Sequence, residues 1–191
     1  MLRAHRLAPA VATAVLAAAA LATAGTAHAA PASTSAAHTR AALDATCSQA
    51  YLPLPDPACT PGATNPDVTQ DTIDSTICVP GYSTSIRPST SYTNRLKVQQ
   101  IAQYGYEDTS TADYEEDHFI PLSLGGHPTD PHNLWPEPHY ATGPSGQGST
   151  DKDAVEYKLY RAVCNHQVDL VPAQQAIVTD WTTALSVLGL G

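Results

Sequence analysis

Residues 114–126 read YEEDHFIPLSLGG, and this stretch decides the fold that we expect. Aromatic and β-branched residues precede a pair of glycines, which predicts a strand over about 114–124 that ends in a turn. Prolines surround residues 133–135 in the tract that follows, so only a very short strand fits there. The sequence therefore predicts a strand, an irregular loop and a short second strand.

Helical patterns follow and precede this unit. Residues 94–104, 152–164 and 170–185 each carry apolar side chains at helical spacing, with Val155, Leu159 and Val163 forming the buried stripe of the middle helix. The Gly, Ser and Pro content of residues 141–150 predicts a loop before that helix. Together these elements predict a small α+β domain over residues 93–191.

The N-terminal part of the chain has a different composition. Residues 46–92 are rich in Pro, Thr, Asp and Ser, so we expect an extended region with short extended pieces at 75–79 and 83–87. Residues 30–45 contain few large apolar side chains and predict a flexible leader.

Residues 1–29 have the pattern of a cleavable signal peptide. Arg3 and Arg6 precede an apolar run over residues 7–24, and Ala27 and Ala29 supply the small side chains of a cleavage site. A membrane anchor is the alternative, but the run is rich in alanine and ends in a good cleavage site. We therefore expect a secreted, extracellular protein that has no membrane segment after cleavage.

The chain contains four cysteines, and an even number in an exported protein predicts disulfides. Four cysteines allow three pairings. Spacing favours a local Cys47–Cys59 bridge and a long-range Cys78–Cys164 bridge. Zinc binding by these cysteines is disfavoured, because no close pair of the C-x-x-C type is present.

The charge of the chain limits its partners. Removal of Arg3 and Arg6 with the signal would change the net charge from −9 to −11. An acidic surface disfavours non-specific binding to phosphate backbones, which depends on Lys and Arg. Glu115 and Glu116 are expected to form a solvated acidic face, and we expect the protein to be a monomer.

The best candidates for catalytic or metal-binding residues are Asp117, His118 and Asn133. A carboxylate at a strand end can hold a hard divalent cation, and a neutral imidazole beside it can take a proton from water. Asn133 can fix the ring by a hydrogen bond to it or to the surrounding backbone. The alternative for Asp117 and His118 is an ion pair that supports the glycine turn, and Asn133 can equally serve as a turn residue.

These residues resemble the core of the HNH endonucleases, in the ββα-metal nuclease group. The match comprises Asp117 with His118, the string IPLSLGG over residues 120–126, Asn133 with Leu134, and a following helix. A wider stretch is similar to secreted actinobacterial proteins with an HNH-like core. The resemblance implies that Asp117 is a metal ligand, His118 the general base and Asn133 the residue that orients it.

The sequence departs from this family at the second metal ligand, which is usually a His or Asn of the helix. Here the helix offers Glu156 as the first choice and Asp153 as the second, while His139 in the loop is a third candidate. Glu156 has an alternative role in an i,i+4 ion pair with Lys152.

We therefore expect a secreted endonuclease that hydrolyses phosphodiester bonds in DNA or RNA with a divalent metal ion. Mg²⁺ or Mn²⁺ is the expected ion and Zn²⁺ the alternative. Two other functions remain open. One is a non-catalytic binding or cell-envelope module on an HNH-like scaffold, and the other is a hydrolase of small phosphoesters.

Overall fold

A two-stranded hairpin lies at the centre of the computed structural model, which describes residues 46–191. β1 (Tyr114–His118) pairs antiparallel with β2 (Leu134–Pro138), so that Tyr114 faces Pro138 and His118 faces Leu134. The expected signal peptide and leader lie outside the described residues. The hairpin and the surrounding helices confirm the α+β class.

The first strand is shorter than the sequence predicts. It ends at His118, and Leu122–Leu124 form a 3-10 turn, η4, after a proline that cannot donate a ladder hydrogen bond. The glycine pair then closes the turn. Gly125 has a φ of 74°, and a Cβ on Gly126 would lie 1.7 Å from the carbonyl oxygen of Ile120. Glycine is therefore required at both positions of this turn.

The expected helices are present with different ends, and two expected extended pieces are wrong. The helix expected over 170–185 is interrupted at residues 181–183. Residues 83–87 are mostly helical, because Gly81 begins a short helix that ends before Pro88. In the expected piece at 75–79, Ser75 ends a 3-10 helix, η2 (Gln70–Ser75), and residues 76–79 form turns. The α-helices are α2 (Tyr82–Ile86), α3 (Thr90–Gln103), α4 (Ser149–Cys164), α5 (Leu170–Asp180) and α6 (Ala184–Val187). The other 3-10 turns are η1 (Gln49–Tyr51), η3 (Thr111–Asp113) and η5 (Pro131–Asn133).

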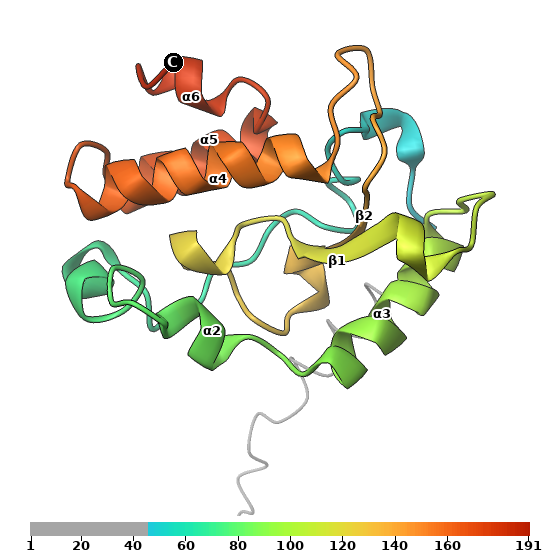
Figure 1. Ribbon diagram of the computed structural model, residues 1–191, viewed down its shortest axis with the longest axis horizontal. Coiled ribbons are helices and arrows are strands. Elements are labelled where there is room, and N and C mark those ends of the chain that lie inside the picture. Colours follow the sequence, from blue (N-terminus) through green and yellow to red (C-terminus); the bar gives the residue numbers. More distant parts are fainter. Residues whose placement is uncertain (1–45) are drawn as a thin grey trace, which may run out of the picture. The chain divides into compact units, whose positions relative to one another are not determined.

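Helices cover the hairpin from two sides. In Figure 1, α4 and α5 lie above the hairpin and α2 and α3 below it, and α3 contacts both strands. Trp135 of β2 and Trp181 after α5 are fully buried and belong to the core. Leu159 of α4 and Ile177 of α5 are also completely enclosed. β1 is thereby held between α3 and α4.

The described chain contains two disulfides, one within residues 46–92 and one that ties this region to α4. They join Cys47 to Cys59 and Cys78 to Cys164, as the spacing favoured. The second connects the region before α2 to the last residue of α4. Disulfides are consistent with an extracellular protein. Within residues 46–191, no helix is long and apolar enough to cross a membrane.

Removal of the long-range disulfide is expected to destabilise the fold more than removal of the local one. The bridges span 86 and 12 residues, and loop-closure entropy then gives losses of about 4.5 and about 3 kcal/mol. Urea unfolding of the Cys78→Ala/Cys164→Ala and Cys47→Ala/Cys59→Ala variants measures the two losses. An equal loss, or the reverse order, would contradict this expectation.

Candidate functional site

Three carboxyl groups meet on the face of the hairpin that is nearest to α4. Glu115 and Asp117 project from the same face of β1 because they lie two residues apart in a strand. Glu137 of β2 faces Glu115 in the register. Carboxylate oxygens of Glu115, Asp117 and Glu137 lie within 4.8 Å of one another, and Glu137 also shares a hydrogen bond with Asp117. Three such oxygens can bind a metal ion.

A buried lysine of α4 binds this cluster. Lys152 lies in the first turns of α4, and only 1% of its surface is exposed. Its Nζ donates to Oδ2 of Asp117 at 2.5 Å, to the carbonyl oxygen of His118 at 3.2 Å and to Oε1 of Glu156. The ammonium group therefore uses all three of its donors. The pair of Lys152 and Glu156 confirms the alternative i,i+4 contact.

The pKa shifts in and around the cluster indicate which groups are charged and which keep a proton. Burial alone would raise the pKa of Asp117, but the ammonium of Lys152 outweighs burial and lowers it. Burial opposes the charge of Lys152, yet the carboxylates around it raise its pKa well above the usual value. Burial raises the pKa of Glu115 to about 7 and that of Glu156 to about 8, and it raises that of Glu137 well above its usual value. Lys152 and Asp117 thus carry the charges, while the glutamates tend to keep protons.

His118 is buried at the end of β1 and held by the backbone. Its Nε2 lies 2.9 Å from the carbonyl oxygen of Pro128, which can only accept, so the neutral ring carries its proton on Nε2. Nδ1 is then the basic nitrogen. Burial lowers the pKa of His118, which keeps the ring neutral near neutral pH. The loop that follows η4 thereby fixes both the tautomer and the direction of the ring.

Asn133 is completely buried, and the hydrogen bonds of its side chain go to the backbone of the turn. Its Oδ1 accepts from the N–H of Ile120 at 2.9 Å and from that of Ala63 at 3.3 Å. Its Nδ2 donates to the carbonyl oxygens of Ile120 and His127. Asn133 therefore binds the two ends of the turn before Pro128, and it can orient His118 only through that turn.

The other predicted metal ligands are near the cluster but are not equivalent. Glu156 binds the ammonium of Lys152. Asp153 is exposed one turn earlier in α4, and both burial and the charge of Asp117 raise its pKa. His139 is exposed, with Nδ1 3.0 Å from the hydroxyl of Ser149 and 3.8 Å from a carboxylate oxygen of Glu115. Their roles as ligands stay predictions.

Sequence reasoning missed Glu137 and misjudged Glu116. Glu137 stands between two prolines, and the signal that could have found it is its register opposite Glu115. Glu116 does not form part of a solvated face, because both of its carboxylate oxygens are buried without a hydrogen-bond partner. Burial raises the pKa of Glu116 well above its usual value, while the nearby charge of Lys97 opposes this shift.

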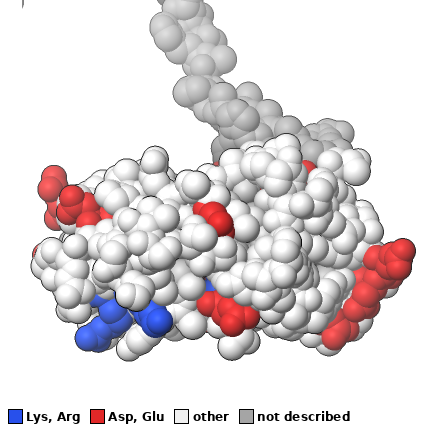
Figure 2. Space-filling model, turned by 90° about the horizontal axis from the view of Figure 1, so that it is seen from above, with Lys and Arg blue, Asp and Glu red and all other residues white. Residues whose placement is uncertain are grey.

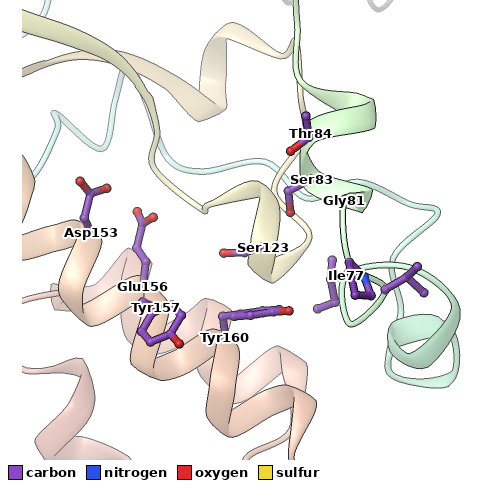
Figure 3. Close-up of a pocket in the computed structure, with 11 residues that line it drawn as sticks. Ile77, Gly81, Ser83, Thr84, Ser123, Asp153, Glu156, Tyr157 and Tyr160 are labelled. Atoms are coloured by element: carbon purple, nitrogen blue, oxygen red, sulfur yellow. The ribbon is translucent and has the colours of Figure 1, made fainter.

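A groove of about 310 Å³ lies along α4, where Asp153 and Glu156 line it but the three clustered carboxyl groups do not. Figure 3 shows Asp153 and Glu156 extending from α4, with Ser123 pointing toward that helix from η4. Arg87 follows α2 and is exposed, and its positive charge lowers the pKa of Glu115 and of His118. The other residues that line the groove are Ile77, Val79, Pro80, Gly81, Ser83, Thr84, Tyr157 and Tyr160.

The comparisons with known proteins assign no family to this arrangement. No family model matches the chain, and neither a curated protein nor a solved structure matches it.

Replacement of Asn133 by alanine is expected to destabilise the protein by about 3 kcal/mol or more, since the buried groups that it binds lose their partners. Urea unfolding measures this loss. The control is Asn94→Ala in α3, where the side chain is exposed and the change should stay within about 0.5 kcal/mol. A loss below about 1 kcal/mol for Asn133→Ala would show that these backbone bonds contribute little.

Stability in EDTA is expected to fall as the pH rises from about 5 to 8, between the usual pKa of Glu156 and its folded value. The folded pKa of Glu156, about 8, lies above its unfolded value, so the folded state holds a proton that the unfolded state has released. Glu156→Gln removes this difference and should reduce the slope by up to about 1.4 kcal/mol per pH unit. Urea midpoints measured across this range test it, and an unchanged slope in the variant would contradict the assignment.

Proposed function

We propose that this protein is a secreted, metal-dependent endonuclease with an HNH-like ββα core formed by β1, β2 and α4. The observation that carries the proposal is the state of His118. Its Nε2–H bond to the carbonyl of Pro128 leaves Nδ1 as a base, and its lowered pKa keeps it unprotonated. A neutral, oriented imidazole is suited to take a proton from water, and the adjacent residue Asp117 belongs to the carboxylate cluster.

The residues present fit a divalent ion. Glu115, Asp117 and Glu137 would hold it through oxygen atoms, which hard cations such as Mg²⁺ and Mn²⁺ prefer. A bound ion would neutralise negative charge on a phosphodiester that is being attacked. The ammonium of Lys152 engages Oδ2 of Asp117, so Oδ1 would be the oxygen that Asp117 offers to an ion.

The side chains around the cluster would divide the remaining tasks. His118 accepts the proton of the attacking water at Nδ1. Arg87, whose charge acts on both His118 and Glu115, would bind a phosphate oxygen of the substrate. Asn133 maintains the turn that contains the carbonyl partner of His118.

The face in Figure 2 has few basic residues, and this favours a substrate that does not depend on contacts with many of them. Figure 2 shows a face that is mostly uncharged, with Asp and Glu in separate groups and a small group of Lys and Arg at one edge. Such a face provides little general attraction for a long polyanion. This observation favours a second candidate function, the hydrolysis of small phosphodiesters in the groove. The ammonium already bound to Asp117 favours the third, a non-catalytic module.

The mature protein, from residue 30, is expected to cleave plasmid DNA or RNA with Mg²⁺ or Mn²⁺ and to lose this activity in EDTA. His118→Ala should lower the rate by about 10²–10⁴-fold, as expected for removal of a general base. His166→Asn is the matched control, because His166 is exposed at the end of α4 and should not affect cleavage.

The other outcomes distinguish the alternatives. Cleavage of a chromogenic phosphodiester without cleavage of nucleic acid would support the small-substrate hydrolase. Absence of any metal-dependent cleavage by folded wild-type protein would contradict the nuclease proposal and favour a non-catalytic module.

A further inference from the structure

The ammonium group of Lys152 occupies a position that oxygen atoms from two elements surround. Asp117 and the carbonyl of His118 approach it from β1, and Glu156 approaches it from α4. Two carboxylates and a peptide carbonyl are also ligand types that a hard divalent cation selects. The position is thus already filled by a cation, and the chain itself supplies that cation.

The surroundings favour a positive charge at this position. The side chains of Asp117 and Glu156 are only 13% and 14% exposed, so water screens them poorly. Two carboxylates brought together in such a place repel each other unless a cation or a proton lies between them. Glu115 and Glu137 add further acidic groups whose pKa values respond to Lys152.

The position of Lys152 in the fold prevents it from leaving easily. Its side chain is almost completely buried, and its backbone belongs to a helix that the Cys78–Cys164 disulfide ties to the chain before α2. Exchange of this ammonium for a free ion would require the long side chain to withdraw from all three acceptors. A mobile ion competes poorly with a cation that is held covalently next to its ligands.

We propose that Lys152 is a tethered cation that fills a metal-like position between Asp117 and Glu156, and that a divalent ion enters this position once the ammonium is removed. The inference goes beyond the proposed function, because it concerns a second cation position and does not depend on catalysis. The ion proposed at Glu115, Asp117 and Glu137 is then the only divalent ion that the wild-type cluster holds.

Mn²⁺ binding to Lys152→Met tests this proposal. Equilibrium dialysis of the purified variant should show one more bound Mn²⁺ per chain than the wild type. Its melting temperature should be below that of the wild type in EDTA and should rise by about 5–10 °C when free Mn²⁺ is a hundredfold above its Kd. Lys158→Met is the control, since Lys158 is exposed on the same helix and its loss should change neither measurement.

Glu156→Gln gives a second measurement, and its wild-type arm does not rely on the stability of Lys152→Met. In the wild-type background it should leave the number of bound Mn²⁺ ions unchanged, because Glu156 binds the ammonium there. In the Lys152→Met background it should remove the additional ion.

Three results would overturn the proposal. The first is a folded Lys152→Met variant without an additional Mn²⁺ ion, and the second is one that stays unfolded whether or not Mn²⁺ is present. The third is loss of a bound ion when Glu156→Gln is made in the wild type. A wild type that binds no Mn²⁺ would contradict the proposed nuclease site instead, and a gain from none to one in Lys152→Met would still support the tethered cation.

Discussion

The ion pair between Lys152 and Asp117 determines how α4 lies on the hairpin. A buried ammonium group is costly unless acceptors replace its water, and here three oxygen atoms do so. Two of these oxygens belong to adjacent residues of β1, so the helix can satisfy its lysine only in one position along the strand. Loss of one partner from such a buried pair typically costs about 3–5 kcal/mol. The same contact that fixes the helix therefore also assembles the acidic cluster.

The direction of His118 depends on a second constraint, the turn between the strands. Gly126 leaves room for the carbonyl of Ile120, and Asn133 then binds both ends of that turn through its amide. The closed turn carries Pro128 to the ring nitrogen of His118. Asn133 thus stabilises the turn directly, and through the turn it also influences the direction of His118. This explains why the sequence pattern could suggest either role.

Local patterns predicted those features whose partners are close in the sequence. The contact of Lys152 with Glu156 follows from helical spacing, but Asp117 lies 35 residues from Lys152, and only the packing of α4 brings them together. Glu137 lies between two prolines and beyond residues 133–135, where the short strand was expected, and only the strand register places it opposite Glu115. Residues 83–87 were expected to be extended because residues 46–92 are rich in Pro, Thr, Asp and Ser. The glycine before them and the proline after them define a short helix instead.

The charge of the cluster has a consequence for the order of binding in a phosphodiester-cleaving enzyme. Asp117 is ionised and beside it Glu115, with a pKa of about 7, is partly ionised at neutral pH, so an anionic substrate meets negative charge. Lys152 offsets the charge of Asp117, but it cannot bind the substrate itself, because its three donors are already used and its side chain is buried. Arg87 is exposed and supplies a single positive charge near the cluster. A divalent ion would have to bind first, releasing the protons of the buried glutamates, before a phosphate could approach His118. In such an enzyme, the buried lysine stabilises the protein scaffold, and the neutralisation of the substrate depends on the ion.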